Sequence, residues 1–173
     1  MQIIFTQIGS AGQAESTFKK FFSGAKDKPI LILEPGIALT ADTMDFVVKV
    51  IDVKNVPDKN LILVNGSIYN IKPTMNAKNL PMKIVCRKKD VSKKNHYDVV
   101  GYSCMEKDYL YSGYWGNVSK GDYIVFKNVG AYTIVLKPPF IKPSPPILTF
   151  ERGKCSIIRR EETIDDIVLT YKI

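Results

Sequence analysis

The pattern of apolar and polar residues predicts short β-strands over most of the chain. Runs rich in valine, isoleucine, tyrosine and phenylalanine alternate with turn signals such as Val56-Pro57-Asp58 and Asn65-Gly66-Ser67. This pattern favours a β-sandwich or a Greek-key-like barrel, with the proline-rich segment 137–146 as a loop. We expect the strands at Asp45–Val53, Asn60–Val64, Pro81–Arg87, Tyr97–Tyr102, Asp122–Phe126, Tyr132–Leu136, Ile147–Phe150 and Ser156–Arg159.

The beginning of the chain has a different pattern. Residues Ala14–Phe22 have helical spacing, with phenylalanines on one side and lysines on the other, and Gly24 follows as a stop signal. Ile30–Leu33 is a continuous apolar run, which is typical of a strand buried on both faces of a parallel sheet. We therefore place one αβ unit in residues 1–42 and a β-domain in residues 43–173. A short helix at Thr163–Leu169, with Thr163 as its N-cap, should close the chain.

Composition is that of a globular protein, with 45% hydrophobic and 10% aromatic residues in 173. Apolar runs are far shorter than the roughly 20 residues that span a bilayer, so we expect a cytoplasmic protein without a membrane partner. The net charge of +8 raises the possibility of nucleic-acid binding. Its densest run, Arg87–Lys94, contains no aromatic residue for base stacking, which favours a solvated loop instead.

Chemistry is suggested by a few short motifs. Three cysteines without a C-x-x-C spacing and a single histidine indicate neither a disulfide framework nor a metal site. Cys104 follows Gly101 by three residues, and an isolated cysteine of this kind is usually a buried small hydrophobe, as we expect for the other two cysteines. Other motifs are Glu34-Pro35-Gly36, Gly121-Asp122, Gly130-Ala131-Tyr132 and Arg159-Arg160-Glu161-Glu162-Thr163. Each would be read as a turn or a surface segment if it stood alone.

Taken together and in this order, the motifs resemble the fold-type III pyridoxal-phosphate decarboxylases, which act on ornithine, diaminopimelate, carboxynorspermidine and related amino acids. The resemblance implies that residues 1–42 are the last helix and strand of a (β/α)8 barrel whose earlier repeats are absent here. It implies pyridoxal 5'-phosphate as cofactor and an amino acid as substrate.

The resemblance also implies roles for individual residues. Glu34 matches the glutamate that faces the pyridine nitrogen of the cofactor, and Gly36 and Tyr132 match residues that contact the cofactor phosphate. Cys104 matches a cysteine that reaches into the active site of the partner subunit and returns a proton to the carbanion after carbon dioxide leaves. A site shared in this way implies a homodimer.

Departures from the family pattern concern the substrate. Ile37 stands where the family usually has an arginine, and Met105 stands where an acidic residue grips the distal amine. Glu106 and Asp108, together with Lys72, are the remaining candidates for substrate contact. These departures make ornithine, lysine and diaminopimelate poor expectations as substrates. The family lysine that binds the cofactor covalently has no match in this chain, so we expect the chain by itself to be inactive.

We therefore interpret the chain as the C-terminal portion of a pyridoxal-phosphate-dependent amino-acid decarboxylase, which needs a missing barrel domain as partner. A non-catalytic remnant of the same family that acts as an interaction protein is the main alternative. A basic β-barrel module for nucleic acid is a weaker one.

Overall fold

The computed structural model describes residues 2–5, 11–27, 30–33, 36–74, 78–86 and 94–172. Glu34 and Pro35, which carry part of the predicted site, lie outside the described residues, as do Arg87 at the end of one predicted strand and the rest of the basic run up to Lys93.

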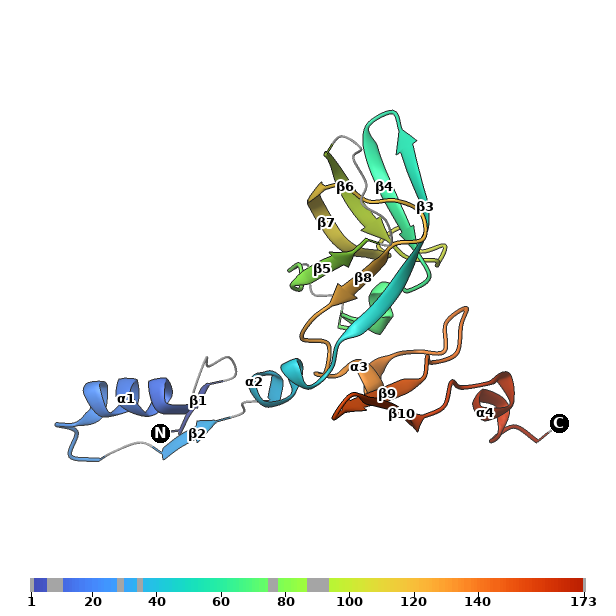
Figure 1. Ribbon diagram of the computed structural model, residues 1–173. Helices are drawn as coiled ribbons and strands as arrows, with labels where there is room; N and C mark the ends of the chain where they lie inside the picture. Colours follow the sequence, from blue (N-terminus) through green and yellow to red (C-terminus); the bar gives the residue numbers. More distant parts are fainter. Residues whose placement is uncertain are drawn as a thin grey trace.

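The N-terminal unit consists of a helix beside two strands (Figure 1). Strand β1 (Gln2–Phe5) pairs in parallel with strand β2 (Ile30–Leu33), and helix α1 (Ala11–Phe22) connects them. The predicted helix and parallel strand are confirmed, whereas β1 was not predicted. Burial of the second strand on both faces is wrong at Ile30, which is 66% exposed, because only one neighbouring strand lies beside it among the described residues.

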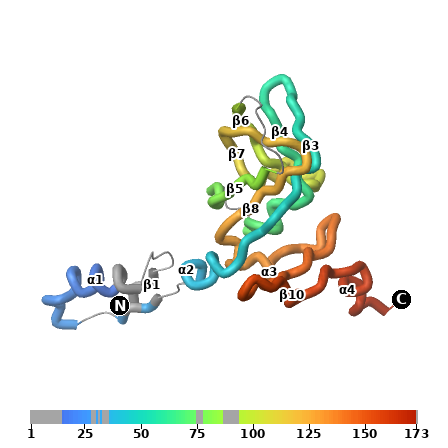
Figure 2. The backbone as a smooth tube through the Cα atoms, in the orientation of Figure 1, coloured from blue at the N-terminus to red at the C-terminus, as the bar shows by residue number. Residues whose placement is uncertain are grey.

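The centre of the molecule is a curled sheet with the strand order β5-β8-β3-β4-β6-β7. Its long strand β3 is shared between two halves: Phe46–Lys49 pairs with β8, whereas the part from Val50 onward pairs with β4. The register shifts between Val50 and Asp52, and such a bulge bends a strand. Figures 1 and 2 show β3 passing from one half of the curl to the other. The strands are β3 (Phe46–Val56), β4 (Lys59–Val64), β5 (Met82–Val85), β6 (Asn95–Val100), β7 (Tyr109–Gly116) and β8 (Tyr123–Phe126).

Inside the curl lies an aliphatic core. Alternate residues of neighbouring strands point inward, as the pleat of a sheet requires. The hydrophobic side chains that are at most 1% exposed are Val48, Val50, Ile62, Val64, Val99, Leu110, Ile124 and Phe126. The mainly β prediction is confirmed in the form of a curled half-barrel sheet. Strand β7 was missed because its Ser112-Gly113 pair interrupts the β-branched pattern.

One predicted strand is wrong. Residues Tyr132–Leu136 form a helical turn, α3 (Thr133–Leu136), instead of a strand. Tyr132 has the left-handed backbone angle φ of 64°, so the chain cannot continue as a strand. The Thr133 hydroxyl donates a hydrogen bond to the Val129 carbonyl, and the Leu136 amide donates to the Tyr132 carbonyl, which closes the turn.

The C-terminal part forms a hairpin followed by a short helix. Strands β9 (Ile147–Glu151) and β10 (Lys154–Arg159) pair antiparallel, and helix α4 (Ile164–Val168) follows. Thr163 caps α4 through a reciprocal capping box with Asp166, so the two predicted strands and the predicted helix are confirmed. The hairpin leaves large apolar side chains exposed, among them Phe150 (75%), Ile157 (68%) and Ile158 (67%).

All three cysteines are exposed and none forms a disulfide bond within the described residues, so the expected burial of Cys86 and Cys155 is wrong. Both lie at or near a strand end with one face open to solvent, which gives a small side chain nothing to pack beneath. None of the helices within the described ranges has the length and apolar character needed to cross a bilayer.

Candidate active site

The predicted phosphate-contacting residues Gly36 and Tyr132 lie together. Gly36 begins the short helix α2 (Gly36–Thr40), and a methyl group built on its Cα would lie 3.8 Å from the Tyr132 hydroxyl oxygen. Tyr132 is about half exposed, so its hydroxyl is accessible. A backbone without a side chain next to a tyrosine hydroxyl suits the binding of a phosphate oxygen.

This pairing depends on the turn that precedes Tyr132. The Gly130 amide donates a hydrogen bond of 2.9 Å to the Ala41 carbonyl, and the Val129 amide donates one of 3.0 Å to the Met44 carbonyl. A Cβ at Gly130 would overlap the Thr40 carbonyl oxygen, so only glycine allows the turn to approach this closely. The sequence Gly-Ala-Tyr thereby joins two segments that are about 90 residues apart.

Cys104 lies in the eight-residue loop 101–108 between β6 and β7, and its side chain is exposed. The loop is closed at its base because the Gly101 amide donates to the Asp108 carbonyl at 2.8 Å. Inside it the Asp108 amide donates to the Met105 carbonyl at 3.1 Å. Met105 is half-buried, whereas Glu106 is exposed. Asp108 is only 3% exposed, and its carboxylate accepts hydrogen bonds from the chain itself.

Beside this loop lies the segment that contains Lys72. The 3-10 turn η2 (Ile68–Asn70) begins with a capping box between Ser67 and Asn70. Tyr69 in this turn donates its hydroxyl to the Met105 sulfur at 3.1 Å, so the two segments touch. Helix α3 also contacts η2, which places the Tyr132 turn in the same region of the molecule.

Lys72 is a buried amine, and few contacts offset the cost of burying its positive charge. It is 6% exposed, and its Nζ donates a hydrogen bond of 3.3 Å to the Lys78 carbonyl. No carboxylate of the described residues lies within ion-pair distance of this Nζ. Burial lowers the pKa of Lys72 below its ordinary value. A cation in this position would be stabilised by a bound anion.

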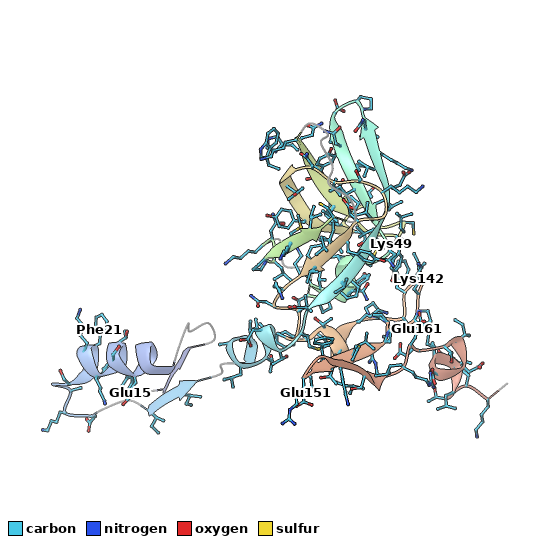
Figure 3. All side chains as sticks on the ribbon, viewed as in Figure 1. Glu15, Phe21, Lys49, Lys142, Glu151 and Glu161 are labelled. Atoms are coloured by element: carbon cyan, nitrogen blue, oxygen red, sulfur yellow. The ribbon has the colours of Figure 1, made fainter. Side chains whose placement is uncertain are left out.

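The proline-rich loop covers one side of the Cys104 loop, a contact that sequence reasoning missed. Lys142 Nζ lies 4.5 Å from the centre of the Tyr102 ring, and Phe140 packs edge-on against Tyr69. Figure 3 shows Lys142 on the loop between α3 and β9, beside the sheet. Burial, with a smaller contribution from the Asp108 charge, raises the pKa of the Tyr102 hydroxyl. The only sequence signal for this packing is the interruption of the prolines by Phe140-Ile141-Lys142.

A mostly apolar groove of about 1230 Å³ runs between the start of β3, the segment that follows β8 and the beginning of β9. Asn70 and Thr133 belong to its wall, so the groove adjoins the candidate site. Arg159 lies at its edge, and the Arg159 guanidinium donates a hydrogen bond to the Pro145 carbonyl at 3.1 Å.

Comparison with known proteins identifies the family to which the chain is similar. Residues 38–130 match the family described as "Pyridoxal-dependent decarboxylase, C-terminal sheet domain". The chain is 33% identical over 140 residues to the probable chloroplastic diaminopimelate decarboxylase of Oryza sativa subsp. japonica, covering 79% of this chain and 28% of that protein. It is 28% identical over 147 residues to the diaminopimelate decarboxylase of Aquifex aeolicus, covering 82% of this chain and 34% of that one.

A solved structure has the same fold. The diaminopimelate decarboxylase of M. jannaschii in co-complex with L-lysine superposes with a TM-score of 0.73 at 22% identity, covering 92% of this chain and 36% of that one. The chain thus spans about a third of the length of the curated relatives it matches. With the family match over more than half of its residues, the chain belongs to the pyridoxal-dependent decarboxylases and contains their C-terminal sheet domain.

Proposed function

We propose that this chain is the C-terminal part of a pyridoxal-phosphate-dependent amino-acid decarboxylase and that it completes the cofactor and substrate site across a homodimer interface. The observation that carries the proposal is the meeting of Gly36 and Tyr132, which the chain brings together from distant segments through the Gly130 turn. This pair would hold the cofactor phosphate, with Glu34 two residues before Gly36 facing the pyridine nitrogen. When bound, the pyridoxal ring supplies an electron sink for the bond that breaks as carbon dioxide leaves.

Cys104 would act as the proton donor of the site. Its thiol is exposed on a loop that is fixed at its base, as a residue offered to a partner subunit must be. A thiol can hold a proton at neutral pH and release it to a nearby carbanion, and general acid catalysis of this kind contributes about 10²–10⁴-fold. Its sulfur would return the proton, while Gly36 and Tyr132 bind and do not take part in proton transfer.

The substrate we propose is an amino acid whose far end carries a carboxylate. Lys72 supports this proposal because it is a buried cation whose described partner is a carbonyl, and a carboxylate would compensate its charge. Met105 offers no carboxylate to bind a simple distal ammonium, and Glu106 is the nearest acidic alternative. The expectation that diaminopimelate is a poor substrate rested on Ile37 and Met105; the names of the relatives favour the diaminopimelate branch, and the far end of diaminopimelate does carry a carboxylate.

The remainder of the barrel would pack on the apolar surface of this chain. Leu148, Phe150, Ile157 and Ile158 on the β9–β10 hairpin are more than half exposed, and the hairpin borders the apolar groove. Exposed apolar area of this extent is typical of a surface that another polypeptide covers. We accordingly expect the 173-residue chain by itself neither to link pyridoxal phosphate to one lysine nor to release carbon dioxide.

A chimaera tests the proposed function. In the Aquifex aeolicus relative, the matching third of the protein is replaced by this chain, and carbon dioxide release from diaminopimelate is measured. We expect an active dimer, with Cys104→Ala lowering kcat by about 10²–10⁴-fold and leaving cofactor binding intact. Cys86→Ser, also an exposed thiol, is the matched control and should keep full activity. A chimaera that is dimeric and binds pyridoxal phosphate but releases no carbon dioxide would favour the non-catalytic alternative.

A further inference from the structure

The carboxylate of Asp108 lies between the two segments of the site that carry the substrate-contacting candidates. Its Oδ1 accepts hydrogen bonds from the Ser67 hydroxyl at 3.0 Å and from the Ile68 amide at 2.7 Å. Its Oδ2 accepts hydrogen bonds from the Ser103 amide at 3.0 Å and from the Ser103 hydroxyl at 2.5 Å. Each oxygen therefore faces a different segment, and neither faces solvent, because Asp108 is 3% exposed.

These contacts connect residues of different proposed roles. On the Oδ1 side, the Ile68 carbonyl accepts a hydrogen bond from the Lys72 amide at 2.7 Å, and Tyr69 follows Ile68 directly. On the Oδ2 side, Ser103 precedes Cys104, and the Ser103 hydroxyl oxygen accepts a hydrogen bond from the Met105 amide at 3.4 Å. One carboxylate thus connects the segment of Lys72 with the loop of Cys104.

The Gly101 backbone lies directly against the Asp108 carboxylate. A Cβ built on Gly101 would lie 2.5 Å from Asp108 Cγ, far inside contact distance. Both carboxylate oxygens act as acceptors in all of these hydrogen bonds, as an ionised carboxylate must. An asparagine at this position has one carbonyl oxygen and one NH2 group. Its NH2 group would face either the Ile68 amide or the Ser103 amide, which are donors and cannot accept a hydrogen bond. Either orientation breaks one half of the connection.

We infer that Asp108 is a positioning residue that holds the Cys104 loop in register with the Lys72 segment, and that it contacts no substrate itself. The effect of this positioning on catalysis rests on the proposed function. The positioning itself can be tested without catalysis, because the position of Met105 beside Tyr69 and the reactivity of Cys104 can be measured on the 173-residue chain.

The experiment uses the chain with Cys86→Ser and Cys155→Ser, so that Cys104 is the single thiol, and with 13C-methyl-labelled methionine. The methyl resonance of Met105 reports its contact with Tyr69, and the methyls of Met44 and Met82, which pack against the core, report the sheet. We expect Asp108→Asn to move the Met105 resonance and to change the rate of Cys104 with an aromatic disulfide by about tenfold, as expected when hydrogen bonds that close a loop are lost. Met44 and Met82 should keep their resonances.

The matched control is Asp122→Asn. Asp122 is also 3% exposed and accepts a hydrogen bond from the Ser119 amide at 2.9 Å, but it lies in the turn before β8. This variant should leave the Met105 resonance and the Cys104 rate unchanged, whatever its effect on stability. Gly101→Ala, which displaces the Asp108 carboxylate without removing its charge, provides a second variant should Asp108→Asn fail to fold.

The inference is overturned if a folded Asp108→Asn or Gly101→Ala chain keeps both the Met105 resonance and the Cys104 rate, or if Asp122→Asn changes them equally. In the chimaera, Asp108→Asn should lower kcat more than it changes KM. If the parent chimaera releases no carbon dioxide while Asp108→Asn still changes the Met105 resonance and the Cys104 rate of the 173-residue chain, the inference holds and the proposed function fails, so the two failures are distinguishable.

Discussion

Replacing Gly130 by alanine should separate the Tyr132 turn from helix α2 and thereby open the proposed phosphate site. The added Cβ would lie closer than 3.0 Å to the Thr40 carbonyl oxygen, which belongs to the backbone and cannot rotate away. Overpacking of this kind costs about 1–3 kcal/mol. The hydrogen bonds from Gly130 to Ala41 and from Val129 to Met44 would be strained together.

The expected loss of unfolding free energy follows from these contacts. Two backbone hydrogen bonds contribute a net free energy of about 1 kcal/mol each. With the steric strain, we expect Gly130→Ala to lower the free energy of unfolding by about 3–5 kcal/mol, a large share of the roughly 5–15 kcal/mol of a typical domain. Urea unfolding followed by circular dichroism and by fluorescence of the single tryptophan, Trp115, measures this loss.

The same substitution should weaken the binding of pyridoxal phosphate by the chimaera, because Tyr132 moves with the turn. Gly24→Ala is the control, since a Cβ there meets no atom within 4 Å. The reasoning is refuted if Gly130→Ala matches the control in both the free energy of unfolding and the cofactor affinity. A loss of stability with unchanged cofactor affinity would leave the turn as a structural feature alone.

Further expected outcomes concern the charges of the site and of the C-terminal segment. Burial lowers the folded-state pKa of Lys72, so between that lowered pKa and 10.5 the unfolded chain binds more protons than the folded chain and stability rises with pH. Lys72→Met should be at least as stable as the parent near neutral pH, and urea unfolding at higher pH should shift the difference in the parent's favour; Lys83→Met, at an exposed position, controls for the loss of one positive charge. Hydrogen bonds from Ser144, first from its side chain and then from its amide, lower the pKa of Glu162, so their stabilisation is present above 4.5 and is lost as pH falls through the folded-state pKa; amide exchange at Ser144 should lose protection in that acid range, and Glu162→Gln should abolish the pH dependence. Unchanged protection of Ser144 across the acid range would contradict this assignment.

The sequence alone determined the fold class and most of the elements, since their signals are local. Alternation of β-branched residues predicted β4 and β9 nearly to the residue, and Thr163 as an N-cap predicted the last helix. The order of short motifs also indicated the family, which the match over residues 38–130 confirms. These features depend on residues that are neighbours along the chain, or on the amino-acid identities in the motifs alone.

Only the tertiary structure decided which residues far apart in the sequence contact one another. The β-branched residues Thr133–Val135 favour a strand by propensity, but the left-handed Tyr132 and the hydrogen bond from Thr133 to Val129 turn this segment into α3. Asp108 could not be distinguished in sequence from a substrate-contacting acid. Only packing shows that its two oxygens face Ser67 and Ser103, because a carboxylate's partners are set by which loops the sheet brings together. For the same reason, the meeting of Gly36 with Tyr132 depended on the Gly130 turn and could not be read from either segment alone.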